Sequence, residues 1–138
     1  MSTDESAAPQ RPLRVLYVED NPVNALLFGE AMKLHGAVEL QVAADGAAAL
    51  AAVAGWLPDV LVLDAHLPDT DGRALLARLR REQPALADTP AVMCSADAEE
   101  EQREGLRGAG FAGYWAKPID LAVVLADLDR LAAQRDAG

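Results

Sequence analysis

The side chains best suited to chemistry in this sequence stand where short apolar segments end. They are three acids, a hydroxyl and an ammonium: Glu19, Asp20, Asp64, Ser95 and Lys117. Two ionised carboxylates about 4 Å apart repel by about 4 kcal/mol at an effective dielectric constant of about 20, so a cluster of them must bind a cation or hold protons. Mg2+ binds one or two carboxylates and takes phosphate oxygens as further ligands. These residue types therefore predict a magnesium site if the fold brings them together.

The segments that carry these side chains alternate between strand and helix patterns. Strands are predicted at 13–18, 38–42, 60–63, 90–94 and 113–116. Helices are predicted at 22–35, 46–54, 73–83, 97–109 and from 121 onward. Strict alternation predicts an α/β fold, a doubly wound five-stranded parallel sheet with helices on both faces. Because the carboxyl ends of parallel strands lie at one edge of such a sheet, the five side chains should converge there.

Local signals set the limits of several helices. Asn21 is a good N-cap with Pro22 at the first helical position, and Gly36 ends the first helix. Apolar residues recur at helical spacing within it: Val23, Leu26, Leu27, Ala31 and Leu34. The third helix carries basic side chains that we expect to point outward: Arg73, Arg78, Arg80 and Arg81. The segment 97–109 is polar and contains two glycines, so the weakest helix is expected there.

Composition excludes several classes of partner. With 22 acidic and 12 basic residues among 138, the net charge of −10 argues against nucleic acid or an anionic membrane surface as the main partner. The single cysteine, Cys94, lies in an apolar run and rules out an intrachain disulfide. No run approaches the roughly 20 apolar residues that cross a bilayer, and the first 12 residues do not resemble a signal peptide. We expect one cytoplasmic domain, a monomer or weak dimer, without membrane insertion.

Several short motifs, in order along the chain, resemble the receiver domain of two-component response regulators, including chemotaxis regulators. They are Leu16-Tyr17-Val18-Glu19-Asp20-Asn21, Asp64 to Pro68 with Asp71-Gly72, Ser95-Ala96, and Tyr114-Trp115-Ala116-Lys117-Pro118. The resemblance covers about 12–135 and implies a flavodoxin-like (βα)5 fold with strand order 2-1-3-4-5. We accordingly expect a disordered N-terminal lead at 1–12, a receiver domain at 13–135 and a C-terminal tail at 136–138.

The resemblance also implies a role for each residue at the strand ends. Asp64 would accept a phosphoryl group from the phosphohistidine of a histidine kinase or a histidine phosphotransfer protein, forming an aspartyl phosphate. The implied Mg2+ ligands are three carboxylates and one backbone carbonyl: Glu19, Asp20, Asp64 and His66. Lys117 would contact a phosphoryl oxygen. Ser95 and the aromatic Tyr114 would move together as a switch, with residues 96–109, Tyr114 and the last helix as the output surface.

This reading makes the chain a signalling phosphoacceptor rather than an enzyme with a separate substrate. A haloacid-dehalogenase-like phosphatase needs a second Asp two positions after Asp64, where this chain has His66. A flavodoxin-like electron carrier needs a hydroxyl- and Gly-rich phosphate loop where residues 19–22 are acidic. A pseudo-receiver, which binds partners without phosphorylation, is disfavoured by the complete acidic set. The His66 side chain could steer the attacking water or shield the phosphate, or the residue could contribute only its backbone carbonyl.

The sequence also leaves two contexts for the domain. We expect a stand-alone, single-domain regulator that works through protein contacts. The alternative is a receiver domain excised from a hybrid histidine kinase or a longer regulator, because residues 19–24 resemble the receivers of hybrid kinases.

Overall fold

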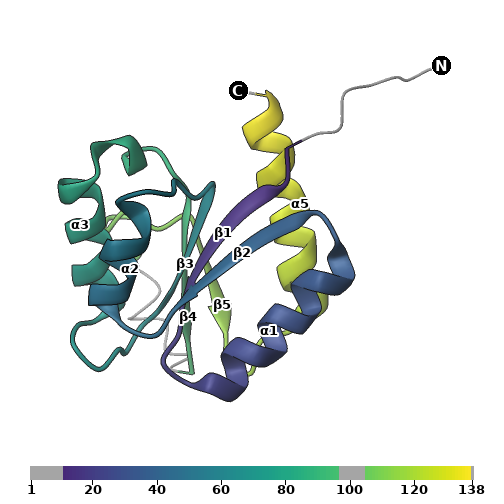
Figure 1. The fold of residues 1–138 in the computed structure, drawn as a ribbon, viewed down its shortest axis with the longest axis horizontal. Helices are drawn as coiled ribbons and strands as arrows, with labels where there is room; N and C mark the ends of the chain where they lie inside the picture. Colours follow the sequence, from purple (N-terminus) through teal and green to yellow (C-terminus); the bar gives the residue numbers. More distant parts are fainter. Residues whose placement is uncertain (1–10, 97–104, 138) are drawn as a thin grey trace.

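The fold is a five-stranded parallel sheet between two layers of helices (Figure 1). The computed structural model describes residues 11–96 and 105–137. The strands are β1 (Leu13–Val18), β2 (Val38–Ala43), β3 (Val60–Asp64), β4 (Ala91–Ser95) and β5 (Gly113–Ala116). The helices are α1 (Pro22–His35), α2 (Gly46–Val53), α3 (Gly72–Glu82) and α5 (Leu121–Ala137), with a short 3-10 turn at Pro84–Leu86. The strand order β2-β1-β3-β4-β5 confirms the predicted flavodoxin-like topology.

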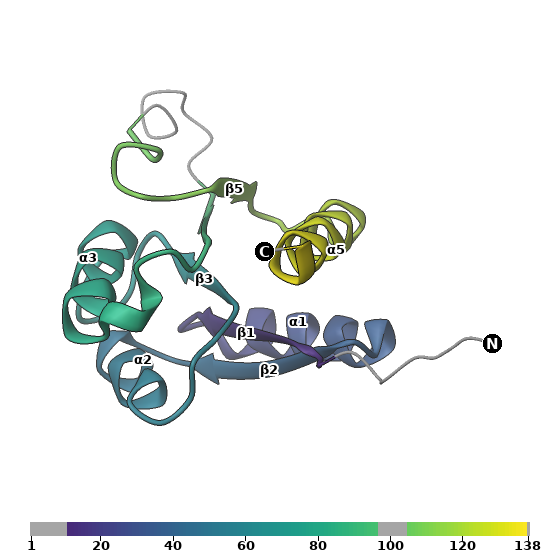
Figure 2. The ribbon, with the colours of Figure 1, turned by 90° about the horizontal axis from the view of Figure 1, so that it is seen from above.

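Helices cover both faces of the sheet. Seen from above, α1 and α5 lie on one side and α2 and α3 on the other (Figure 2). Successive strand residues point to opposite faces, so Leu61 and Leu63 join the core under α2 and α3, whereas Val60 and Val62 join the core under α1 and α5. Cys94 is fully buried in this second core, and burial raises the pKa of its thiol to about 12. The apolar run that carries this cysteine is therefore part of the core.

The first helix begins and ends as predicted, but its buried face differs from the apolar repeat in the sequence. Asn21 accepts hydrogen bonds from the N–H groups of the first turn, and Gly36 ends the helix with a φ of 81°. The buried residues of α1 are Phe28, Ala31 and Met32. Large apolar side chains of the repeat are exposed instead: Val23, Leu26, Leu27 and Leu34. Apolar spacing therefore located this helix without identifying the side that packs on the sheet.

The third helix packs its leucines inward, and one of its four arginines is not a surface charge. Arg73, Arg78 and Arg81 are exposed, in agreement with the prediction. Arg80 is half-buried, and its guanidinium donates hydrogen bonds to three backbone carbonyls, those of Leu86, Thr89 and Gly110, at 3.2, 2.7 and 3.1 Å. The prediction that Arg80 points outward is wrong, because its planar guanidinium can donate hydrogen bonds to all three of these carbonyls at once.

The predicted helix at 97–109 lies mainly outside the described residues. Its described part, 105–110, forms turns. The N–H of Phe111 donates to the Leu106 carbonyl and that of Gly110 to the Arg107 carbonyl, while Gly110 has a φ of 97°. This pair of bonds around a left-handed glycine is the arrangement that closes the carboxyl ends of helices.

The first and last described segments of the chain meet at the edge of the sheet opposite the carboxyl ends of the strands. Arg11 and Arg135 both donate hydrogen bonds to the carboxylate of Asp59, and Arg135 also donates to the backbone carbonyls of Arg11 and Pro12. Arg11 and Pro12, which we had assigned to the disordered lead, are thus held to the domain, and α5 continues past the expected boundary at 135. Within the described part of the chain, no helix combines the length and apolarity needed to span a membrane.

Candidate functional site

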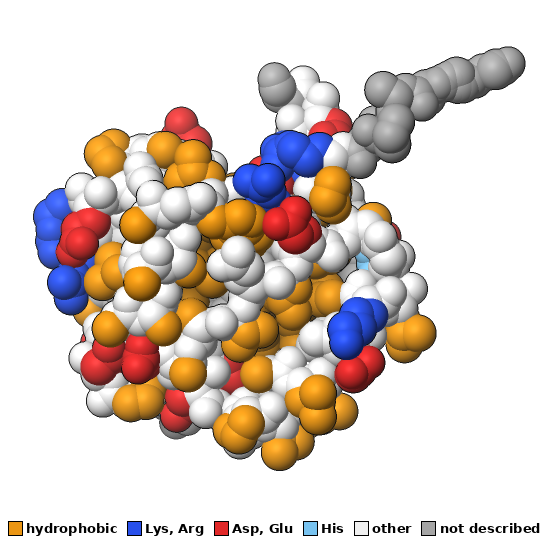
Figure 3. Space-filling model, viewed as in Figure 1, with side chains coloured by type: hydrophobic (Ala, Val, Ile, Leu, Met, Phe, Trp, Pro, Cys, Tyr) orange, Lys and Arg blue, Asp and Glu red, His pale blue; other side chains and the backbone are white. Residues whose placement is uncertain are grey.

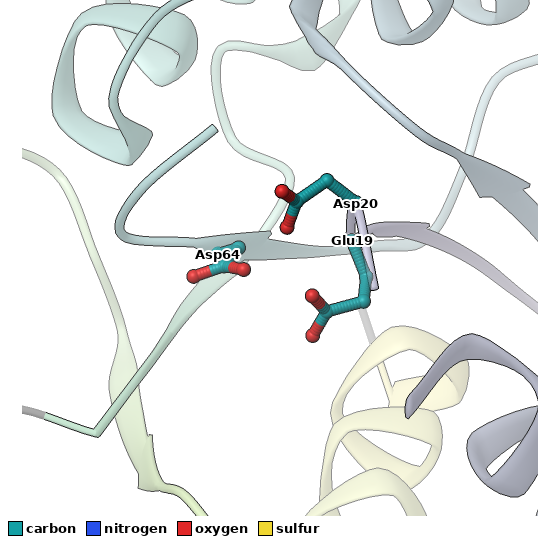
Figure 4. A group of neighbouring side chains, drawn as sticks. All are labelled: Glu19, Asp20 and Asp64. Carbon is teal, nitrogen blue, oxygen red and sulfur yellow. The ribbon is translucent and has the colours of Figure 1, made fainter. Parts of the chain in front are cut away.

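Three acidic side chains meet at the carboxyl edge of the sheet. Glu19 and Asp20 directly follow β1, and Asp64 is the last residue of its neighbour β3. Figure 4 shows the three carboxylates facing a common space. One oxygen from each lies within 4.8 Å of the others. Since the strands are parallel and adjacent, the sheet brings Asp64 together with acids that are 44 and 45 positions earlier in the sequence.

Lys117 joins this cluster from the end of β5. Its ammonium lies 2.7 Å from Oε1 of Glu19 and 3.0 Å from Oδ2 of Asp64. The side chain of Lys117 is 17% exposed, that of Glu19 1% and that of Asp64 9%, so solvent screens these charges weakly. Burial alone would lower the pKa of Lys117, but the two carboxylates outweigh it and raise the pKa. The ammonium therefore stays protonated and bridges the two strand ends.

Glu19 is held by donors from its own strand and from the chain that follows it. Its Oε1 accepts a hydrogen bond from the hydroxyl of Tyr17 at 3.0 Å, and its Oε2 accepts one from the N–H of Asn21 at 3.2 Å. Burial would raise the pKa of Glu19, but the hydrogen bonds from Lys117 and Asn21 lower it overall. Tyr17 was not among the predicted site residues. Its spacing from Glu19 could have revealed it, because residues two apart on a strand share a face.

Asp64 ionises less easily than an ordinary aspartate, because its pKa is raised. Burial raises its pKa, and the hydrogen bonds from Lys117 and from the His66 N–H only partly counter that effect. The His66 N–H donates to Oδ1 of Asp64 at 3.2 Å, while the His66 side chain is exposed. A bound cation would favour the ionised form of this carboxyl.

The loop after Asp64 closes back on itself, and we call residues 65–71 the acceptor loop. The N–H of Leu67 donates to the Thr70 carbonyl at 3.0 Å, and the N–H of Gly72 donates to the Ala65 carbonyl at 3.1 Å. A Cβ at Gly72 would lie 2.8 Å from the backbone oxygen of Asp64, so only glycine lets α3 start this close to β3. The loop is therefore a compact hairpin beside the acidic cluster.

Ser95 and Tyr114 lie on the other side of Asp64. Ser95 is buried at the end of β4, next to β3 in the sheet, and the Tyr114 hydroxyl donates to the Ser95 backbone carbonyl at 3.0 Å. Both residues line a cavity of about 480 Å³ together with His66, Arg73 and Leu106. This space separates the acceptor loop from the described end of the 97–109 segment.

An apolar surface adjoins the cluster on the side of α1. Lys117 lines a cavity of about 230 Å³ with Leu27, Phe28, Ile119 and Leu121. On the same helix as Leu27, which is 61% exposed, Val23 and Leu26 are 62% and 64% exposed. Hydrophobic side chains gather over the amino-terminal half of α1 in the space-filling view (Figure 3). These three side chains form one apolar strip of α1, because residues three and four positions apart lie on the same side of a helix.

The donor set at the strand ends suits a hard cation. Carboxylate oxygens from Glu19, Asp20 and Asp64 lie close enough to share one ion. Mg2+ prefers such oxygen ligands and retains waters in its remaining positions. The structure thus brings together the acids, Lys117 and Ser95 that the sequence singled out, with Tyr114 bonded to the Ser95 backbone.

Comparison with known proteins supports the resemblance to receiver domains that the sequence motifs indicated. A family model described as "Response regulator receiver domain" matches residues 15–129. The probable transcriptional regulatory protein TcrX of Mycobacterium tuberculosis is 38% identical over 125 residues, which are 90% of this chain and 51% of TcrX. The chain therefore spans about half the length of this curated relative.

Solved structures agree at the level of the fold. The chemotaxis protein CheY4 of Vibrio cholerae superposes with a TM-score of 0.80 at 26% identity, covering 87% of this chain and 98% of CheY4. The receiver domain of the sensor histidine kinase PA1611 from Pseudomonas aeruginosa, with a magnesium ion in its active-site cleft, gives a TM-score of 0.75 at 28% identity, covering 87% of this chain and 97% of that one. The chain belongs to the response regulator receiver domain family of two-component signalling.

Proposed function

We propose that Asp64 is the phosphoacceptor of a two-component or phosphorelay pathway and takes its phosphoryl group from a phosphohistidine. The observation that carries the proposal is the convergence of three carboxylates and Lys117 at one sheet edge, with Asp64 contacted by the ammonium at 3.0 Å. The Asp64 carboxylate can act as a nucleophile, and the Lys117 ammonium lies beside it, where it can stabilise the negative charge of an incoming phosphoryl group. The chain acts as a signalling protein that is modified on its own Asp64.

The transfer exchanges one bond to phosphorus for another. An oxygen of Asp64 bonds to phosphorus while the bond from phosphorus to the imidazole nitrogen of the donor breaks, and the imidazole leaves with the electron pair. Lys117 contacts a phosphoryl oxygen, which spreads the charge of the transferring group. The N–H of His66, 3.2 Å from Oδ1 of Asp64, holds the carboxylate in place.

Mg2+ is the cofactor that fits the donor set. Glu19, Asp20, Asp64 and the backbone carbonyl of His66 would hold it. When bound, it neutralises the carboxylates and the phosphoryl charge. The PA1611 receiver domain, which carries a magnesium ion in its active-site cleft, supports the assignment by similarity.

A histidine kinase or histidine phosphotransfer protein docks on the apolar face of α1. Val23, Leu26 and Leu27 are exposed there, and Leu27 lines the cavity that Lys117 also lines. A donor protein that covers this face brings its histidine to the same sheet edge as Asp64. Burial of such side chains supplies the attraction, at roughly 25 cal/mol per Å2 of apolar surface.

Phosphorylation switches a surface on the opposite side of Asp64. It adds about −1.5 to −2 charge, enough to attract the Ser95 hydroxyl and bias two arrangements of the neighbouring chain. Tyr114, bonded to the Ser95 carbonyl, then turns into the adjoining cavity. The output surface comprises residues 96–109, of which 97–104 lie outside the described structure, with Tyr114 and α5. Unchanged hydrogen-exchange protection of 96–109 when a phosphoryl mimic binds Asp64 would contradict this switch.

We propose two contexts for the domain, the first of which is a single-domain cytoplasmic regulator. TcrX is about twice the length of the matched region, and PA1611 is a sensor kinase that carries a receiver domain. A receiver domain within a hybrid kinase or a longer regulator is therefore the second candidate. The sequence flanking the gene decides between them.

Transfer of labelled phosphate from a panel of histidine kinases and phosphotransfer proteins tests the function. The wild type should acquire an acid-stable, base-labile label, and Asp64→Asn should acquire none. Asp59→Asn is the matched control, because Asp59 precedes the same strand at its opposite end. Equal labelling of wild type and Asp64→Asn rejects Asp64 as the acceptor.

A further inference from the structure

The acceptor loop is tied to a helix that takes no part in the acidic cluster. Oδ1 of Asp69 accepts a hydrogen bond from the N–H of Gly46 at 2.8 Å, and Oδ2 accepts one from the N–H of Ala47 at 3.0 Å. These two N–H groups belong to the first turn of α2 and have no acceptor within the helix. The carboxylate also lies at the positive end of the helix dipole, and the N–H groups lower the pKa of Asp69.

The amino end of α2 is shaped to receive this loop. A Cβ at Gly46 would lie 2.8 Å from Cγ2 of Thr70 and 3.2 Å from Oδ1 of Asp69, so a side chain there would push the loop away. The N-cap of α2 is a different carboxylate, that of Asp45, which accepts from the N–H of Ala48 at 2.7 Å. The helix therefore has its own cap, and the Asp69 contact is an additional link between helix and loop.

The link crosses the acidic cluster because of the strand order. In the sheet, β1 lies between β2, which leads into α2, and β3, which leads into the acceptor loop. A contact from the loop to the start of α2 must therefore pass beside the end of β1, where Glu19 and Asp20 stand. The end of β1 is itself fixed to β2, since the N–H of Glu19 donates to the Ala43 carbonyl at 2.9 Å.

We propose that Asp69 is a positioning residue for the magnesium site, holding the acceptor loop across the end of β1 so that His66 keeps its place beside Asp64. The inference rests on the proposed function, because it takes the backbone carbonyl of His66 as a ligand. The hairpin bonds of the loop transmit the restraint from Asp69 to His66. Residues that orient a metal ligand typically change affinity 10- to 100-fold when they are removed.

Titration with Mn2+, followed by the electron paramagnetic resonance signal of free Mn2+ and by competition with Mg2+, tests the proposal. Asp69→Ala should weaken affinity for both ions about 10-fold. Gly46→Ala should weaken it in the same direction, although alanine favours the helix more than glycine does. Asp45→Ala is the matched control: it removes one negative charge and one cap from the same helix without touching the loop, and should change affinity less than about 2-fold.

The outcomes separate this inference from the proposed function. Wild-type affinity in both Asp69→Ala and Gly46→Ala overturns the positioning role, and so does an equal loss in Asp69→Ala and Asp45→Ala, which would indicate charge or helix stability alone. Asp64→Asn is titrated in parallel. If Asp64→Asn binds Mn2+ as tightly as the wild type, the magnesium site and the proposed function both fail; if it loses binding while Asp69→Ala keeps it, only the positioning role fails.

Discussion

Replacement of Lys117 by methionine tests whether the acidic cluster needs a cation. Its ammonium lies 2.7 and 3.0 Å from the oxygens of Glu19 and Asp64. Without it, carboxylates within 4.8 Å of one another face each other at a weakly solvated edge. At an effective dielectric constant of about 20, each such pair repels by about 3.5 kcal/mol. Removing one partner of a buried ion pair costs about 3–5 kcal/mol, and we expect the lower end because protonation of Asp64 relieves part of the repulsion.

Urea unfolding in EDTA and in saturating Mg2+ measures the effect. Lys117→Met should lose about 3 kcal/mol of unfolding free energy in EDTA, and Mg2+ should restore more stability to the variant than it adds to the wild type. Mg2+ at 100 times its dissociation constant stabilises any binding-competent fold by about 2.7 kcal/mol. The control is Lys33→Met, which removes an ammonium that is 77% exposed and 3.7 Å from Glu30. It should change stability by less than about 0.5 kcal/mol.

Two results would refute this reasoning. The first is a Lys117→Met variant as stable in EDTA as the wild type. The second is a double variant, Asp64→Asn with Lys117→Met, that is no more stable in EDTA than Lys117→Met alone. In that case repulsion between the carboxylates would not be the cause of the loss.

Three further predictions concern other parts of the molecule. Burial would raise the pKa of Asp59, but hydrogen bonds from arginines, including Arg135, lower it below its unfolded value. The stabilisation from the ionised carboxylate is therefore present above the unfolded pKa and is lost as pH falls through the folded pKa. Asp59→Asn should cost about 2 kcal/mol of unfolding free energy at pH 7 and flatten the acid limb of a stability–pH curve. Leu27→Asp should slow labelling by a protein donor about 10-fold but leave labelling by acetyl phosphate unchanged, whereas Leu34→Asp, 90% exposed at the far end of α1, should affect neither. Arg80→Met leaves three carbonyls without their guanidinium and should cost about 2–3 kcal/mol in urea unfolding, and a loss below about 0.5 kcal/mol would show that solvent replaces it.

Much of the fold was readable from the sequence because its signals are local. Apolar runs such as 60–63 end in polar residues and alternate with capped helices, and this pattern alone predicted five parallel strands. The convergence of Glu19, Asp64 and Lys117 then followed from topology, since parallel strands end at one edge. Tyr17 was missed although the spacing of two from Glu19 indicated it.

Other features depend on packing between distant segments and had no local signal. In α1, Leu26 and Leu27 are as apolar as Phe28 and Met32, so hydrophobicity could not decide which side meets the sheet. Phe28 is selected by its contacts with Tyr17 of β1 and Trp115 of β5, and the leucines stay exposed.

The residues at the candidate site and the contacts that support them also differ in whether the sequence alone could predict them. The sequence by itself determined which residue types stand at the strand ends, because those types follow buried strands directly. The tertiary structure alone decided that Asp69 reaches α2 and that Arg80 turns to backbone carbonyls. Their partners lie between six and 30 positions away, and backbone C=O groups occur in every residue and N–H groups in every residue except proline. Only the folded chain determines which of these backbone groups lack partners within their own elements and are therefore available to a distant side chain.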